Sequence, residues 1–213
     1  MSLFCLLWVP LFYLLRRSIT GAGSSGGVWA LLFGSITAII QFFLGNIVSP
    51  GGFGFSRWLF GFIDIVSLPV LVPLFLYFLI VLARNFSGEV DFANFTLLWL
   101  IPVAALRAIS WSPRSDPILL ITVPMLWTAI AVGIHFLVIW MANNFRWWKA
   151  VLSFPCIFVM PVIAAGAYWA FFSQQTLLGL LLLFVVHIPL GLSLAVDISF
   201  SAAKGNSNSY SGK

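Results

Sequence analysis

Hydrophobic residues run along this chain in long stretches, and short segments between them carry the charges and most of the glycines. A membrane-spanning β-strand would show about ten residues of alternating polarity, whereas these runs are continuous. A backbone in hydrocarbon must also pair all of its N–H and C=O groups internally, which continuous runs achieve as helices. The sequence therefore predicts an all-α polytopic membrane bundle of seven helices. The stretches cover residues 1–15, 28–48, 58–83, 96–111, 118–142, 150–172 and 176–196.

The lengths of the stretches test this count, because crossing the hydrocarbon core takes about 20 residues. Five of the seven have 21 to 26 residues. The stretches 1–15 and 96–111 are short, so six helices plus a short N-terminal segment is the alternative. The connections are too short to fold separately, so residues 1–203 form a single transmembrane domain. The small polar residues of 204–213 predict a disordered cytosolic tail.

The charges support a membrane location and set an orientation. Only 7% of the residues are charged and 62% are hydrophobic, whereas about a quarter of a soluble domain is charged. If the connections alternate between two sides, seven basic residues share one side, which the positive-inside rule assigns to the cytoplasm. This predicts N-terminus out, C-terminus in, and the cytoplasmic (inner) membrane. The seven basic residues on the predicted cytoplasmic side are Arg16, Arg17, Arg84, Arg146, Lys149, Lys204 and Lys213. They form no concentrated basic face, which argues against nucleic-acid binding.

Tryptophans support the predicted boundaries. Most of them fall near predicted helix ends, where an indole sits in the headgroup layer and keeps its N–H hydrated. Only Trp8 and Trp127 fall in the middle of predicted helices. The boundary set is Trp29, Trp58, Trp99, Trp111, Trp140, Trp147, Trp148 and Trp169.

Two charged residues inside the apolar stretches are candidates for function. A charged, unpaired side chain there costs at least about 2.5 kcal/mol. Counted from the outer boundary, Asp64 lies about 9 Å deep and Arg107 about 6 Å deep. Their opposite charges and matched depths predict a pair between the third and fourth helices. The pair either fixes helix register or forms a substrate-binding site that faces an outward cavity.

Two histidines also lie inside apolar stretches. His135 and His187 are about 10 and 14 Å from the cytoplasmic ends of two helices that run in the same direction. Two imidazoles near one level are what a bis-histidine haem b requires, and Gly191 would leave room for a flat ring. Alternatively, each histidine forms a hydrogen bond with a hydroxyl or carbonyl group of a neighbouring helix.

Small residues recur every four positions in the second stretch, at Ala30, Gly34 and Ala38. This spacing lets two helices approach closely in lipid. The partner is either another helix of this chain or a separate membrane subunit.

Prolines interrupt several predicted helices, and transporters use such broken helices at their binding sites. The third stretch contains Pro69 and Pro73, and the sixth contains Pro155 and Pro161. These two helices run in opposite directions, which would fit an inverted repeat of helices two to four against helices five to seven.

The sequence lacks the residue patterns of known intramembrane enzymes, which argues against an enzyme. Only one aspartate lies inside an apolar stretch, no glutamate accompanies either histidine, and no G-x-S-x-G context is present. The chain also has no ATPase motif, so energised transport would need a separate ATPase or an ion gradient.

Three functions are compatible with these residues. The first is a small permease, or the membrane subunit of a transporter, that handles a small molecule at Asp64 and Arg107. The second is a haem b or quinone-associated electron-transfer subunit that uses His135 and His187. The third is a structural or assembly subunit of a larger membrane complex that packs through the small-residue face of the second helix.

Overall fold

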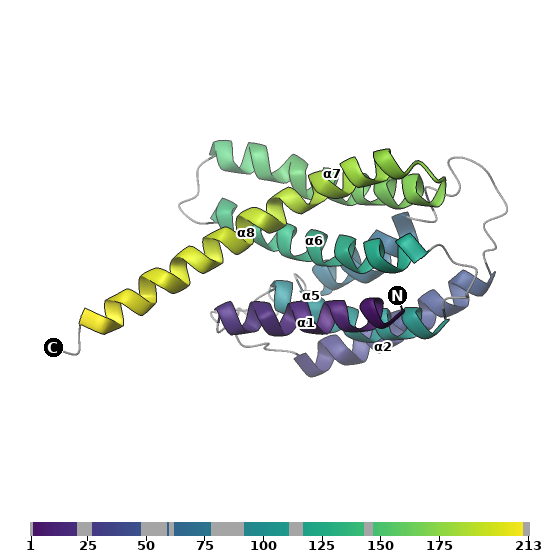
Figure 1. Ribbon diagram of the computed structural model, residues 1–213, viewed down its shortest axis with the longest axis horizontal. Coiled ribbons are helices and arrows are strands. Elements are labelled where there is room, and N and C mark those ends of the chain that lie inside the picture. Colours follow the sequence, from purple (N-terminus) through teal and green to yellow (C-terminus); the bar gives the residue numbers. More distant parts are fainter. Residues whose placement is uncertain are drawn as a thin grey trace.

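The computed structural model describes residues 2–20, 27–47, 59, 62–77, 92–110, 117–142 and 147–210, and every regular element in these ranges is a helix (Figure 1). The all-α prediction is therefore confirmed for this part of the chain. The element η1 is a π-helix, and residues 72–77 continue it as α-helix. The elements are α1 (Ser2–Thr20), α2 (Gly27–Ile47), η1 (Phe62–Leu71), α5 (Phe92–Ser110), α6 (Pro117–Ala142), α7 (Trp147–Phe172) and α8 (Thr176–Tyr210).

The helices form two layers with η1 between them. In the lower layer of Figure 1, α5 packs extensively against both α1 and α2. In the upper layer, α6, α7 and α8 all pack against one another. The π-helix η1 contacts α2 and α5 in one layer and α6 and α7 in the other. The third predicted helix therefore lies at the junction of two three-helix groups.

Successive helices run in alternating directions through the bundle (Figure 1). The helix α1 runs from the end marked N to the opposite end, and α2 returns. In the upper layer, α6 and α8 run in one direction and α7 runs in the other. The parallel arrangement expected for the fifth and seventh helices is thus present in α6 and α8.

Five helices in the part of the chain that the structure describes are long and apolar enough to cross a bilayer. These candidate spans are Leu3–Thr20, Phe92–Ile109, Ile118–Met141, Trp147–Phe172 and Thr176–Val196. Two shorter apolar helices, Gly27–Phe43 and Val66–Tyr77, lie within the second and third predicted stretches.

The two stretches predicted to be short are full helices. The helix α1 continues to Thr20, and α5 begins at Phe92, so each contains 19 residues. The predicted boundaries at 15 and 96 are wrong because polar residues were taken as helix ends. Arg16 and Asn94 are buried within these helices, where they form a hydrogen bond with each other.

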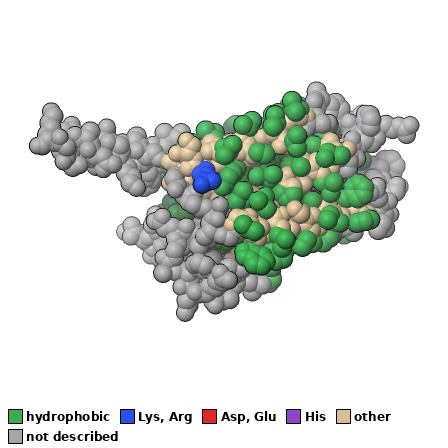
Figure 2. Space-filling model, turned by 90° about the horizontal axis from the view of Figure 1, so that it is seen from below, with side chains coloured by type: hydrophobic (Ala, Val, Ile, Leu, Met, Phe, Trp, Pro, Cys, Tyr) green, Lys and Arg blue, Asp and Glu red, His purple; other side chains and the backbone are tan. Residues whose placement is uncertain are grey.

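The outer surface of the bundle is apolar. Val28 on α2 is 81% exposed and Phe184 on α8 is 71% exposed. Hydrophobic side chains cover the face of the lower layer, and a Lys or Arg side chain appears near one end of it (Figure 2). An apolar exterior around an apolar core is the arrangement that a lipid environment requires.

Aromatic packing joins α2 to α5. Trp99 stacks on Phe33 with ring centroids 6.0 Å apart, and its centroid lies 6.2 Å from that of Phe95. Trp99 is 1% exposed because it packs between helices, and its position in the headgroup layer stays a prediction. Because α5 begins at Phe92, Trp99 lies about 10 Å along the helix from its start.

Prolines do not make the third and sixth helices equivalent. The helix α7 continues through Pro155 and Pro161 over all 26 residues, whereas Pro69 lies within the π-helical η1. The two helices therefore differ in backbone geometry. The inverted repeat stays a prediction.

A tight turn joins α7 to α8. The N–H of Gln175 donates to the carbonyl of Ala170 at 2.8 Å, and the N–H of Gln174 donates to that of Phe171 at 3.1 Å. These two bonds define a Schellman motif. Gln174 has a φ of 61°, the left-handed conformation that usually belongs to glycine at this position.

The helix α8 is longer than its apolar part. It continues to Tyr210, whereas the composition of residues 204–213 predicts disorder. Once a helix is nucleated, each added residue gains one further backbone hydrogen bond, so the apolar segment of α8 supplies the nucleus for its polar extension. The extension projects beyond both layers (Figure 1).

Candidate functional site

The predicted site residue Asp64 is the third residue of η1. Its side chain lies outside the described residues, so the Asp64–Arg107 pair stays a prediction. The backbone of η1 is described, and it is unusual because π-helical turns are rare and concentrate at functional sites. The sequence predicted an interrupted third helix from its prolines, but hydropathy carries no signal for π-helical geometry.

The segment around Asp64 lies deep in the bundle. Val66 and Val70 are fully buried, Pro69 and Pro73 are buried, and Ser67 is half-buried. Because η1 contacts helices of both layers, any displacement of one layer against the other acts on it directly. The irregular segment therefore lies where the two layers meet.

Arg107, the second predicted site residue, lies near the end of α5. Its side chain is half-buried, and the guanidinium carbon lies 5.8 Å from the ring centroid of Trp127 on α6. Trp127 is fully buried, so this cation–π contact is partly desolvated and correspondingly strong. The sequence placed Trp127 in the middle of a helix but did not identify it as the contact of Arg107.

Two contacts tie α1 to the helices that carry Arg107 and Trp127. The indole N–H of Trp8 donates to the hydroxyl of Thr128 at 3.2 Å, and this hydroxyl donates to the carbonyl of Met125 at 2.9 Å. The thiol of Cys5 donates to the carbonyl of Ala104 at 3.8 Å. The first helix therefore packs against both helices that form the contact between Arg107 and Trp127.

Arg16 forms a buried polar contact that the sequence did not predict. Its Nη1 donates to Oδ1 of Asn94 at 3.0 Å, and the two side chains are 2% and 0% exposed. Arg16 was predicted to lie in a loop after the first helix, whereas the structure places it within α1. A local pattern cannot identify the contact because Asn94 was assigned to a connection rather than to a helix.

His187 has a fixed tautomer. Its Nδ1 lies 2.8 Å from the carbonyl of Leu183, a distance at which Nδ1 must carry the proton and donate it. The buried Nε2 then presents a lone pair and has no hydrogen-bond partner in the described part of the chain. Metal-bound histidines show this pattern, with one nitrogen held by a carbonyl and the other available as a ligand.

The two histidines do not face each other across the contact between α6 and α8. That contact is marked by Gly133, where an added Cβ would lie 3.2 Å from Cβ of Pro189. His135 and His187 are each two residues from these positions, or about 200° around their helices. By this count the imidazoles point away from the Gly133–Pro189 contact, and the ligation of a haem by His135 and His187 stays a prediction.

The small-residue face of α2 packs inside the chain. Ala30, Gly34 and Ala38 are buried, and a Cβ added to Gly34 would lie 2.3 Å from the carbonyl oxygen of Trp99 on α5. Of the two partners that the sequence left open, the structure shows the internal one. In this structure α5 covers the face, and the packing of the chain against a larger membrane complex stays a prediction.

Several buried polar atoms have no hydrogen-bond partner within the described residues. The uncharged ones are Thr96 Oγ1, Trp99 Nε1, Ser153 Oγ and His187 Nε2. They come from α5, α7 and α8. Each such group raises the free energy of the folded state unless water or a ligand satisfies it, so clusters of them are found at functional sites.

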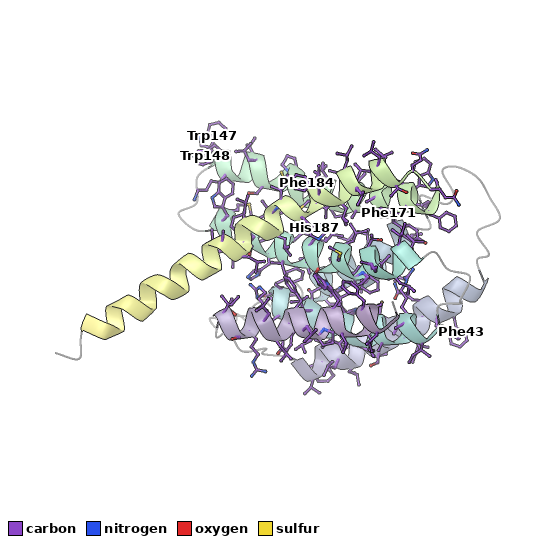
Figure 3. All side chains as sticks on the ribbon, in the orientation of Figure 1. Phe43, Trp147, Trp148, Phe171, Phe184 and His187 are labelled. Carbon is purple, nitrogen blue, oxygen red and sulfur yellow. The ribbon has the colours of Figure 1, made fainter. Side chains whose placement is uncertain are left out.

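Tryptophans and a lysine gather at the end of the bundle where α7 begins (Figure 3). Trp140 and Trp148 meet edge to face with centroids 5.6 Å apart, and Lys149 Nζ lies 5.5 Å from the Trp140 ring centroid. Trp147 is 74% exposed. This arrangement is typical of a membrane interface, where indole rings and basic side chains meet lipid headgroups.

Comparison with known proteins returned no match to any family model, curated protein or solved structure. Among the residues that the structure describes, no three His, Cys, Asp or Glu side chains lie close enough together to hold a metal ion.

Proposed function

We propose that this protein is a small integral membrane permease, or the membrane subunit of a transporter, which handles a small molecule beside η1. One observation carries the proposal: an irregular helix contacts both three-helix groups at their junction. Transporters place substrate and ion sites where a discontinuous helix lies between two bundles, because rocking of the bundles then exposes the site to each side in turn.

The chemistry of nearby residues supports this proposal. Asp64 lies on η1, and Arg107 lies on α5, which contacts η1. Intramembrane charged residues are costly and are retained mainly where they serve a pathway or a binding site. Trp127 beside Arg107 adds a flat apolar surface. Together these groups would bind a small molecule that carries a charge and an apolar part.

Membrane topology forms part of the same proposal. Five candidate spans would make seven crossings together with the two shorter apolar helices, and the alternating helix directions are compatible with that count. Arg17 at the end of α1 and Lys149 at the start of α7 lie at the same end of the bundle. The positive-inside rule makes this end cytoplasmic, with N-terminus out and the cytoplasmic membrane as the location.

Uptake measurements test this proposal. Cells that produce the protein are compared with cells carrying an empty vector for accumulation of labelled amino acids, carboxylic acids, nucleosides and organic cations. We expect uptake of one class, abolished by Asp64→Asn and by Arg107→Ala and retained by Arg17→Ala, which removes an exposed charge. Wild-type uptake in both site variants, at equal membrane abundance, would contradict the proposal.

A second candidate function is favoured by His187 alone. Its Nδ1 is held by the carbonyl of Leu183, and its Nε2 has no hydrogen-bond partner among the residues that the structure describes, so this nitrogen would be available as an axial ligand in an electron-transfer subunit. A visible spectrum of the purified protein tests this candidate. A Soret band lost in His187→Ala supports it, and a spectrum without that band removes it.

A further inference from the structure

We infer that the end of the bundle where α7 begins contains a binding site for one anionic phospholipid. Lys149 would hold the phosphate of the headgroup beside the indole rings of three tryptophans, and the exposed apolar side of α7 would hold an acyl chain. This lipid site does not involve η1 and would exist whether or not the protein is a permease.

The first step is the position of the Lys149 ammonium group. Its Nζ lies 5.5 Å from the ring centroid of Trp140 in the last turn of α6, and the ring of Trp148 meets that of Trp140 edge to face. A cation–π contact orients an ammonium group without neutralising its charge, because an indole ring has no net charge. Lys149 is therefore a pre-positioned cation, and it loses little further conformational freedom when it binds an anion.

The second step is the charge around Lys149. Lys149 is the third residue of α7, and the first turn of this helix contains no acidic residue. The N-terminus of a helix carries a partial positive charge, and a lysine there adds to it rather than offsetting it. An anion in contact with Lys149 would be attracted by both charges, so the partner that complements this end of α7 is negative.

The third step is the surface beside Lys149, which suits a lipid headgroup. Trp147 is 74% exposed and Trp148 is 40% exposed, and both project from the end of α7 (Figure 3). An indole ring combines an apolar face with one N–H donor. This combination matches the glycerol and ester region of a phospholipid, where apolar carbons alternate with oxygen acceptors.

The fourth step is an exposed apolar stripe that continues from Trp148 along α7. Its members recur at intervals of three or four residues, so they lie on one side of the helix. They are Trp148, Leu152, Pro155, Val159 and Val162, and all five are exposed. A cationic group at the end of an apolar stripe complements a molecule with an anionic end and a hydrocarbon chain. A phospholipid has this form, whereas a soluble anion does not.

The net charge of the headgroup decides which phospholipid binds more tightly. Phosphatidylcholine compensates its phosphate with its own ammonium group, whereas phosphatidylglycerol carries an uncompensated negative charge. Attraction between one lysine and an anionic membrane surface corresponds to about fivefold in affinity. We therefore expect a preference for phosphatidylglycerol that depends on Lys149.

Native mass spectrometry of the purified, delipidated full-length protein tests this site, because it resolves each bound lipid. The protein is titrated with dioleoyl phosphatidylglycerol or dioleoyl phosphatidylcholine, and the dissociation constant of the first bound lipid is measured. We expect phosphatidylglycerol to bind more tightly, and Lys149→Gln to weaken its binding about fivefold. Lys149→Arg keeps the charge and the cation–π contact, so it should retain most of the affinity.

Arg17→Gln is the matched control, because it removes one exposed positive charge from the same end of the bundle. It should leave the binding of phosphatidylglycerol unchanged. Equal weakening by Arg17→Gln and Lys149→Gln would show that the lipid responds only to total charge, and this would overturn the site. Equal wild-type affinity for the two lipids, or displacement of the lipid by inorganic phosphate, would also overturn it.

A second variant covers the case in which Lys149→Gln does not accumulate in membranes. Trp147 is mostly exposed, so Trp147→Leu removes an indole ring of the site with little effect on helix packing. It should weaken the binding of phosphatidylglycerol, and an unchanged dissociation constant in this variant counts against the site.

Discussion

The guanidinium of Arg16 donates a hydrogen bond of 3.0 Å to the side-chain oxygen of Asn94, which lies 78 residues further along the chain. The bond joins the last part of α1 to the first turn of α5, and both side chains are buried. A buried guanidinium needs hydrogen-bond partners for its N–H groups, and this bond supplies one of them, so the contact ties α1 to α5 at one end of the bundle. The first helix is therefore an integral part of the fold.

Replacing Asn94 tests this contact. Asn94→Ala should lower the free energy of unfolding by about 1.5 to 3 kcal/mol, the range for a hydrogen bond to a charged group. Arg17→Ala, which changes the exposed neighbouring charge, should change it by less than about 0.5 kcal/mol. Thermal unfolding of purified protein in one detergent measures both. Equal melting temperatures for the two variants would show that the buried contact contributes nothing.

Two helical glycines form a matched pair for testing the packing of α2 on α5. Gly34→Ala should destabilise the protein by about 1 to 3 kcal/mol, because its new Cβ would meet the backbone carbonyl of Trp99 at 2.3 Å. At Gly191 an added Cβ meets no atom within 4 Å, so Gly191→Ala should be neutral or stabilise by up to about 1 kcal/mol. The account of this interface is wrong if Gly34→Ala melts at or above the wild-type temperature.

The turn between α7 and α8 offers a stabilising substitution. Gln174 has a φ of 61°, which costs an L-residue with a Cβ about 1 kcal/mol or more. Gln174→Gly should therefore raise the free energy of unfolding by about 1 kcal/mol, while Gln174→Ala, which keeps the Cβ, should leave it nearly unchanged. Denaturant titration of the wild type, Gln174→Gly and Gln174→Ala measures these effects. A Gln174→Gly variant that is less stable than the wild type would show that the backbone at Gln174 is not strained.

The hydrogen bond between Trp8 and Thr128 is testable by a double-mutant cycle. Trp8→Phe and Thr128→Val each remove one partner of the 3.2 Å bond between α1 and α6. Hydrogen bonds between membrane helices have an average coupling energy of about 0.6 kcal/mol, and we expect a value near that. The free energies of unfolding of the two single variants and the double variant give the coupling. If the effects of the two single substitutions on the free energy of unfolding are additive, the hydrogen bond does not stabilise the packing of α1 against α6.

Sequence patterns predicted the part of this structure that depends on hydropathy. Continuous apolar stretches gave the helical class, and both histidines and Arg107 lie within helices as expected. The predicted helix ends were less accurate, because charged and polar residues were assumed to mark the ends of helices. Arg16 and Asn94 violate that assumption by satisfying each other across 78 residues, a pairing that no local window can detect.

The candidate site was also predicted only in part from the sequence. The prolines of the third stretch indicated an irregular helix, but the choice of π-helical rather than kinked α-helical geometry depends on how η1 packs between two layers. The matched depths of His135 and His187 ignored rotation about the helix axes. Depth follows from counting residues, whereas the direction of a side chain follows from which neighbours the helix meets.

The water accessibility of η1 decides whether a solute site lies beside it. Ser67→Cys is introduced into protein in which Cys5 and Cys156 are replaced by alanine, and its reaction with a small membrane-impermeant thiosulfonate is timed in intact membranes. Phe184→Cys, on the lipid-facing side of α8, is the control. These reagents react with thiolates, which form in water but not in hydrocarbon. The account predicts modification of Ser67→Cys at a rate well above that of the control, and equal, negligible rates at both positions would contradict a solute site beside η1.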